Sequence, residues 1–247
     1  MMPRRILPLL AAVLCAPLFP CQAQSEPDGE DRNQPKELKV EATKQITLSY
    51  LLALPPDYEA AKDKKYPVML FLHGAGERGD DLEKVKVHGP PKLVGKMKEL
   101  DDFIIVSPQC PKDQWWDGEA LRALVDEVVK TYRVDEKRLY CTGLSMGGYG
   151  TWMLSCRYPD LFAAIVPICG GGEPKHLKNI KDMPIWVFHG AKDTAVKIGE
   201  SERLVEELKR LGNDVKFTVY PEAGHDCWTE SYANPELYAW LLSKAKE

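Results

Sequence analysis

The sequence predicts an α/β fold, in which a mostly parallel, twisted sheet carries helices on both of its faces. Short apolar runs of strand length recur along the chain, and segments with a helical period lie between them. Runs that are apolar throughout, such as 67–72 and 103–106, are typical of parallel strands buried on both faces. Strands that alternate with helices predict a parallel sheet, and ligands bind such sheets at the carboxyl ends of the strands.

The expected strands begin with an alternating segment at 46–54, which two prolines end. Continuous apolar runs supply most of the others, and three glycines close the run at 163–168. In order, strands are expected at 46–54, 67–72, 103–106, 138–142, 163–168, 185–188 and 215–220.

The expected helices lie at 119–132, 146–158, 198–211 and 235–244. In the first, leucines and valines recur at the spacing of one helix face. Gly212 is expected to end the third helix, and Asn234 to cap the last one with Pro235 in its first turn.

The N-terminal residues 1–23 have the layout of a secretory signal peptide. Two arginines precede an apolar stretch at 6–19, and Cys21 and Ala23 place small residues at the −3 and −1 positions of a cleavage site. We therefore expect a secreted or periplasmic protein that is cleaved near Ala23. The apolar stretch is too short and too interrupted by proline for a stable membrane span. Lipid anchoring at Cys21 is the alternative, but the Phe-Pro pair before that cysteine fits a lipidation site poorly.

The remainder is expected to form one domain. Residues 24–36 are rich in Gln, Glu, Asp, Pro and Asn, which predicts a disordered leader, and 37–247 then form a single catalytic domain. The formal net charge of −4 gives no electrostatic case for binding nucleic acid. Five cysteines remain after the signal, so at least one is unpaired within the chain, and no spacing among them resembles a zinc site. We expect neither a metal nor a cofactor.

The pentapeptide Gly-Leu-Ser-Met-Gly at 143–147 lies between an expected strand and an expected helix. The nucleophile elbow of α/β-hydrolases has this arrangement, in which a strand leads into Gly-x-Ser-x-Gly and a helix follows. The turn packs its backbone so closely that the residues two before and two after the serine must be small, and Gly143 and Gly147 meet that demand. The elbow predicts an α/β-hydrolase fold with Ser145 as nucleophile.

An acid and a base follow in the chain order expected for this fold. Asp193 lies on a tight loop after the strand at 185–188, and His225 follows the strand at 215–220. We assign His225 as the base that takes the serine proton and Asp193 as the acid that orients the ring. Other residues are less well placed for these two roles. The alternative acids are Asp182, Glu222 and Asp226, and the alternative bases are His73, His88, His176 and His189. We expect His73 and His189 to shape their loops instead. An ordinary turn residue is the alternative for Asp193.

Small residues directly after the strand at 67–72 predict an oxyanion hole. We assign the backbone N–H groups of Ala75 and Met146 to it, with Gly74 or Gly76 as alternatives to Ala75. Tryptophans near these loops are candidates for substrate contact, although packing explains them equally well: Trp115, Trp116 and Trp228.

With these motifs the chain resembles secreted α/β-hydrolases of the predicted peptidase/esterase group, close to phospholipase/carboxylesterase and dienelactone-hydrolase-like enzymes. The matching segments are the oxyanion loop 72–79, the elbow 143–148, the acid loop 189–193 and the histidine loop 224–228. The resemblance runs from about residue 40 to the end. It implies hydrolysis of carboxylic esters through an acyl-enzyme, with kinship to the prolyl oligopeptidase catalytic domain and to feruloyl and acetyl-xylan esterases.

The leading hypothesis is a serine carboxylesterase acting on short-chain or polysaccharide-linked acyl esters. A serine peptidase of prolyl-oligopeptidase-like type and a non-catalytic binding module on the same fold are the alternatives. Only sixteen residues separate the strands at 163–168 and 185–188, which leaves no room for a large lid there and predicts a shallow, open cleft. The acyl group, the alcohol and the oligomeric state are not determined by the sequence.

Overall fold

The computed structural model describes residues 45–247, so the predicted signal peptide, the leader and the first residues of the domain lie outside the described residues. A seven-stranded sheet with the order β1-β3-β2-β4-β5-β6-β7 forms the centre. Every neighbouring pair is parallel except β1 and β3, so the predicted fold class is confirmed. The strands are β1 (Tyr50–Ala53), β2 (Tyr66–Leu72), β3 (Ile104–Pro108), β4 (Val134–Leu144), β5 (Ala164–Ile168), β6 (Trp186–Gly190) and β7 (Lys216–Tyr220).

All four predicted helices are present, and shorter elements join them. The helices are α1 (Gly89–Leu93), α2 (Gly118–Thr131), α3 (Met146–Arg157), α4 (Gly199–Arg210), α5 (Trp228–Ala233) and α6 (Pro235–Leu242). Four 3₁₀ segments accompany them: η1 (Ala75–Glu77), η2 (Leu82–Val87), η3 (Lys98–Leu100) and η4 (Pro174–Ile180). The sequence did not predict α1 or α5, because helices of five and six residues are too short to display a helical period.

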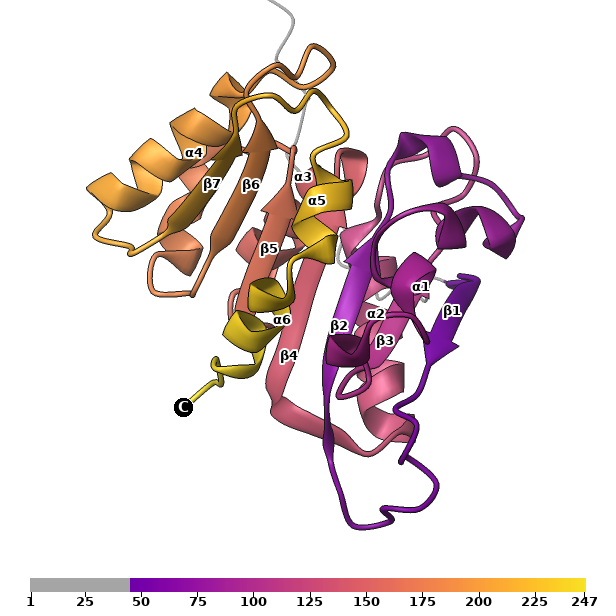
Figure 1. Ribbon diagram of the computed structural model, residues 1–247. Helices are drawn as coiled ribbons and strands as arrows, with labels where there is room; N and C mark the ends of the chain where they lie inside the picture. Colours follow the sequence, from indigo (N-terminus) through magenta and orange to yellow (C-terminus); the bar gives the residue numbers. More distant parts are fainter. Residues whose placement is uncertain (1–44) are drawn as a thin grey trace, which may run out of the picture. The chain divides into compact units, whose positions relative to one another are not determined.

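The helices cover both faces of the sheet, and the alternation of side chains along β2 shows how. Val68, Leu70 and Leu72 point into the core beneath α2, α3 and α4. Met69 and Phe71 point into the opposite core, beneath α5 and α6. Figure 1 shows α1, α5 and α6 in front of the sheet, with α2 and α3 behind it. Because β2 is buried on both faces, its sequence is apolar throughout.

The predicted helix ends have the expected geometry. Gly212 has a φ of 87° and closes α4, where the N–H of Asn213 donates to the Leu208 carbonyl at 2.9 Å. Asn234 caps α6 by accepting a hydrogen bond from the Glu236 N–H at 3.0 Å. Both signals act within a few residues, so the sequence was sufficient to predict them.

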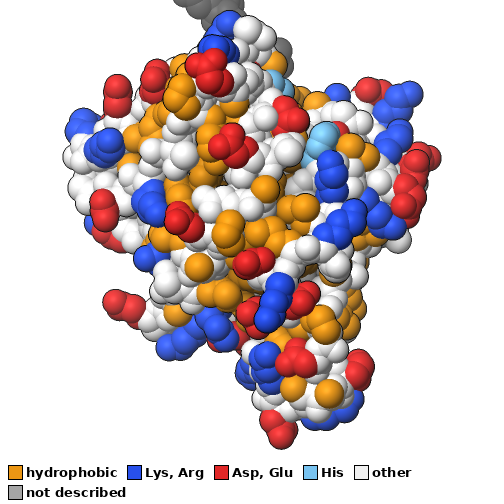
Figure 2. Space-filling model, viewed as in Figure 1, with side chains coloured by type: hydrophobic (Ala, Val, Ile, Leu, Met, Phe, Trp, Pro, Cys, Tyr) orange, Lys and Arg blue, Asp and Glu red, His pale blue; other side chains and the backbone are white. Residues whose placement is uncertain are grey.

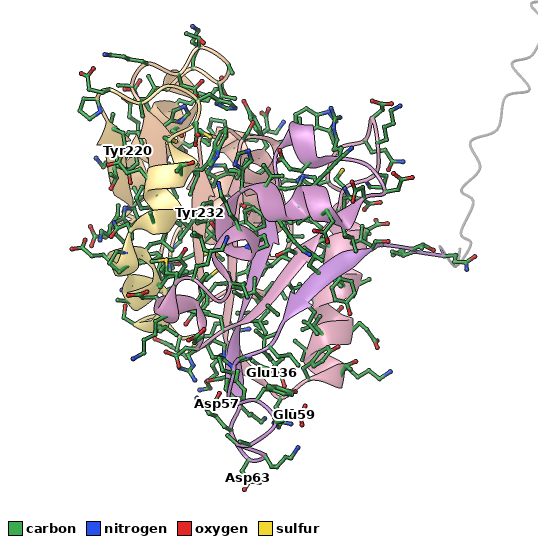
Figure 3. All side chains as sticks on the ribbon, turned by 45° about the vertical axis from the view of Figure 1, so that its right-hand side comes forward. Asp57, Glu59, Asp63, Glu136, Tyr220 and Tyr232 are labelled. Carbon is green, nitrogen blue, oxygen red and sulfur yellow. The ribbon has the colours of Figure 1, made fainter. Side chains whose placement is uncertain are left out.

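The surface is mixed in charge. Figure 2 shows acidic and basic side chains interspersed over the displayed face, with hydrophobic side chains between them. The connection from β1 to β2 carries Asp57, Glu59 and Asp63 at the amino end of the strands, whereas Tyr220 marks the carboxyl end of β7 (Figure 3). Between residues 45 and 247, no helix has the length and hydrophobicity needed to cross a bilayer.

Candidate active site

The three predicted catalytic side chains meet at the carboxyl edge of the sheet. Ser145 follows β4, Asp193 follows β6 and His225 follows β7. Figure 1 shows these three strands side by side in the sheet with β5 among them. His225 Nε2 lies 2.9 Å from Ser145 Oγ, and His225 Nδ1 lies 2.7 Å from Asp193 Oδ2. The tautomer protonated at Nδ1 satisfies both contacts, because Nδ1–H donates to the carboxylate and Nε2 accepts from the serine hydroxyl.

Backbone contacts explain why the elbow needs its glycines. Ser145 has φ 53° and ψ −118°, a backbone conformation that side chains rarely adopt. A Cβ on Gly147 would lie 1.9 Å from the Leu72 carbonyl oxygen, and one on Gly143 would lie 2.4 Å from the Gly147 carbonyl oxygen. The neighbouring backbone therefore leaves no space for larger residues, as the sequence predicted.

The carboxylate of Asp193 is fully buried and fixed in orientation. Its Oδ1 accepts hydrogen bonds from the N–H groups of Ala195 and Val196, both at 2.9 Å, which leaves Oδ2 for His225. His189 Nε2 lies 3.3 Å from Oδ2, but the His189 ring also contacts Ser201 Oγ and the Val196 carbonyl. His189 therefore braces the acid loop, as predicted for it.

The rival acids are engaged elsewhere. Asp182 pairs with Lys181, and Glu222 pairs with Lys192 on the surface. Asp226 accepts hydrogen bonds from the N–H and the hydroxyl of Thr229 at the start of α5. Each of these contacts leaves Asp193 as the carboxylate that meets His225.

The oxyanion loop lies against the nucleophile. A Cβ on Gly74 would lie 3.7 Å from Ser145 Cβ. The Gly74 N–H donates to Glu77 Oε2 at 2.9 Å, so this alternative donor is already occupied. Ala75 begins η1, and its carbonyl accepts from Arg78 Nε at 2.9 Å. Met146 begins α3, where the first N–H groups of a helix have no partner within the helix.

His73 fixes the position of this loop through hydrogen bonds of its buried ring. Its Nδ1–H donates to the Gly74 carbonyl at 2.6 Å, and its Nε2 accepts from the Cys110 N–H at 3.0 Å. The Trp116 Nε1–H donates to the His73 carbonyl at 3.3 Å. Burial lowers the pKa of His73 from its ordinary 6.5 to about 4, so the ring is neutral at pH 7. His73 is a loop-shaping residue, as the sequence indicated.

The three candidate tryptophans have different surroundings. Trp228 donates to His88 Nδ1 at 3.3 Å and stands edge-on to the His225 ring, with centroids 5.1 Å apart. Trp116 is buried and packs on His73, whereas Trp115 is 64% exposed. Trp115 and Trp116 both line a groove beside α3, while Trp228 belongs to the α5 side of the sheet. Trp116 and Trp228 both have packing partners, and Trp115 is the most exposed of the three; substrate contact stays a prediction for each of them.

A buried cysteine beside the site escaped the sequence analysis. A ligating atom of Cys169, one of Asp193 and one of His225 all lie within 4.8 Å of one another. The pKa of Cys169 lies well above its usual range, mainly because the thiol is buried and also because the Cys227 thiol is its neighbour. The sulfur is therefore a neutral thiol. A metal there would need the thiolate and would break the bond between His225 and Asp193, so these donors fit a resident metal poorly.

The other cysteines are structural. All five cysteines of the described region are free and buried, which agrees with the expectation of at least one unpaired thiol. Cys141 and Cys169 have no exposed surface. The only sequence signal for the proximity of Cys169 to the site was its position directly after a strand.

Comparison with known protein families identifies the family of this chain. Residues 112–237 match the model of the dienelactone hydrolase family. This chain belongs to the dienelactone hydrolase family. The matched range includes the elbow, the acid loop and the histidine loop, whereas the oxyanion loop precedes it.

Relatives of this dienelactone hydrolase family member carry esterase names. A bifunctional acetylxylan esterase/xylanase of Neocallimastix patriciarum is 24% identical over 190 residues, which are 70% of this chain and 26% of that protein. An endo-1,4-beta-xylanase/feruloyl esterase of Xylanibacter ruminicola is 28% identical over 191 residues, which are 68% of this chain and 25% of that protein. The chain thus spans about a quarter of the length of these two relatives.

Solved structures of esterases superpose on this chain. A thermostable esterase superposes with a TM-score of 0.72 and 34% identity, over 81% of this chain and 60% of that one. A ferulic acid esterase superposes with a TM-score of 0.60 at 22% identity, over 78% of this chain and 89% of that one, and supports the fold alone.

Proposed function

We propose that this protein is a serine carboxylesterase that forms an acyl-enzyme on Ser145. The hydrogen-bonded series from Ser145 through His225 to Asp193, with contacts of 2.9 and 2.7 Å, is the observation that carries the proposal. Serine and histidine within this distance, with the histidine held by a third group, are the geometry of an activated nucleophile.

The proposed reaction has two steps. Ser145 Oγ attacks the ester carbonyl carbon while His225 Nε2 takes the hydroxyl proton, and the protonated ring then gives that proton to the leaving alcohol. Water attacks the acyl-enzyme in the same way, with His225 again as base, and releases the acid and the free serine. Asp193 holds Nδ1–H and stabilises the imidazolium that forms in each step.

The negative charge on the carbonyl oxygen needs donors in both steps. The N–H groups of Ala75 and Met146 are our candidates, because Gly74 already donates to Glu77 and because the first turn of α3 favours negative charge. The names of the relatives support esters as substrates, including acyl groups on polysaccharides.

The proposal is tested with para-nitrophenyl esters from acetate to dodecanoate. We expect turnover of the short esters, and a loss of at least about 10⁴-fold in kcat for Ser145→Ala. Ser155→Ala is a matched control, since Ser155 lies on α3, the helix that follows Ser145, and its hydroxyl donates to the Thr151 carbonyl. A folded wild type that cleaves peptide amides but no ester would favour a peptidase. A folded wild type that cleaves neither would favour a binding module.

A further inference from the structure

A groove of about 720 Å³ runs along α3 on the face of the sheet that α2 and α4 also cover. One wall is the side of α3 from Tyr149 to Arg157, which spans about 12 Å at 1.5 Å per residue. Trp115 and Trp116 form a second wall, and Gly171–Glu173 with η4 form the third. Tyr149, at the near end of the groove, lies one helical turn beyond Ser145.

The walls are aromatic, and one polar group in them is unsatisfied. Trp115 is 64% exposed and meets the Tyr149 ring edge-to-face, with centroids 6.0 Å apart. Trp152 is only 1% exposed and lines the groove, and its Nε1–H is buried without a hydrogen-bond partner. An alkyl chain in this groove would leave that donor unsatisfied. A ligand with an accepting oxygen would satisfy it once the indole turns to present its buried Nε1–H to the groove.

The charges at the rim favour an uncharged ligand. Arg157 pairs with Glu119 at 2.7 Å, Arg203 pairs with Glu200 at 2.5 Å, and Glu173 lies 3.9 Å from Lys175. A charged ligand would have to compete with these ion pairs, and His176 is the remaining side chain of the lining that titrates near pH 7.

The length of the groove decides between a small acyl group and an extended ligand. An acyl group bound to Ser145 starts about 6 Å along the helix axis from Tyr149 and about 18 Å from Arg157, at 1.5 Å per residue. A short acyl group therefore reaches only the near end. The far end suits a chain of rings, each with an apolar face that stacks on tryptophan and with hydroxyl groups that stay in water.

We propose that this groove binds a run of uncharged sugar units, the alcohol half of a polysaccharide-linked ester. The proposal rests on the proposed esterase function for its biological sense, but the binding itself does not require catalysis. Trp115 stacks against the sugar at the near end, and the Trp152 Nε1–H donates to a ring or hydroxyl oxygen.

The test uses the Ser145→Ala variant of the whole chain and xylohexaose as probe. The indole N–H signals of the six tryptophans are followed by NMR during the titration. We expect the Trp115 and Trp152 signals to shift, whereas Trp186 and Trp240, which pack on each other in the opposite core, stay unchanged. Adding Trp115→Ala is expected to weaken binding about three- to tenfold. Val219→Ala serves as the control, because Val219 is an exposed side chain on β7 outside the groove.

Three outcomes would overturn the proposal: no binding of xylohexaose, equal shifts at all tryptophans, or unchanged affinity in the Trp115→Ala variant. Trp152→Phe, checked for folding by its thermal unfolding, tests the donor separately and is expected to lower affinity as well. Failure of the esterase proposal is distinguishable, because it is decided by para-nitrophenyl acetate turnover in the wild type and leaves the titration readable.

Discussion

Acidification should destabilise this protein through His73, the buried anchor of the oxyanion loop. In the neutral ring, Nδ1–H donates to the Gly74 carbonyl and Nε2 accepts from the Cys110 N–H. Protonation would turn Nε2 into a second donor that faces the Cys110 N–H, in a site with no exposed surface. Glu77 Oε2, 3.9 Å from Nδ1, is the nearby carboxylate that would favour the charged ring, and Arg78 opposes it.

The sign follows from the lowered pKa, which falls from 6.5 to about 4 on folding. Between pH 6.5 and pH 4 the unfolded chain is protonated at this histidine and the folded protein is not. The contribution of the neutral ring to the free energy of unfolding is therefore fully present above pH 6.5 and is lost as the pH falls towards 4. At about 1.36 kcal/mol per pH unit, the full loss is about 3.4 kcal/mol, of which about 2 kcal/mol is already lost at pH 5.0.

Urea unfolding of the wild type and of His73→Gln at pH 7.5 and pH 5.0 measures this effect. Glutamine can accept from the Cys110 N–H and does not titrate in this range, so the variant should lose about 2 kcal/mol less than the wild type between the two pH values. The other titrating groups contribute equally to both proteins and cancel in the comparison. Equal losses in the two proteins would refute the reasoning. If His73→Gln does not fold, an NMR titration of the His73 ring that places its pKa at 6 or above would refute it instead.

Other perturbations have equally defined outcomes. In Asp193→Asn, the side-chain oxygen keeps the bonds from Ala195 and Val196 and the amide N–H₂ then faces His225 Nδ1, which forces the wrong tautomer. The kcat on para-nitrophenyl acetate should fall about 10⁴-fold while the unfolding midpoint barely changes, and a loss below tenfold would contradict the role of Asp193. Gly147→Ala would place a Cβ 1.9 Å from the Leu72 carbonyl oxygen, so it should lower the free energy of unfolding by several kcal/mol or prevent folding. A Cβ on Gly76 would have no atom within 4 Å, so Gly76→Ala should leave the free energy of unfolding, measured with urea, nearly unchanged. Burial raises the pKa of the Cys110 thiol to about 11 and those of the Cys141 and Cys156 thiols to about 12. Peptide mapping after iodoacetamide treatment at pH 8 should therefore find all three cysteines unmodified until urea unfolds the chain. Modification in the native protein would contradict their burial.

The active-site motifs were predictable because each carries its own local reason. The glycines around Ser145 stand at fixed positions of a five-residue motif, although the backbone that excludes larger residues there includes that of β2. Asp193 and His225 follow strands whose carboxyl ends share one edge in a parallel sheet. The helix ends at Gly212 and Asn234 depend on hydrogen bonds that span at most five residues. Such signals can be read from the chain without knowing which elements pack together.

Contacts that leave no recognisable pattern in the sequence decided the rest. Glu77 occupies the N–H of Gly74, and this contact separates the candidate oxyanion donors, but its direction depends on how η1 folds. Cys169 lies beside Asp193 and His225 only because β5 ends between β4 and β6 in the sheet. The short helix α5 brings Trp228 against His225 and had no periodic signal in the sequence.

The sequence by itself determined the fold class, the order of the strands and longer helices, and the three residues proposed for catalysis, because periodicity and turn chemistry are properties of neighbours along the chain. Only the tertiary structure decided the different surroundings of Trp115 and Trp116, which are adjacent in sequence. Trp115 is exposed on the groove, whereas Trp116 is buried and donates to the His73 carbonyl. Burial depends on which segments fold over a residue, and that information lies far away along the chain.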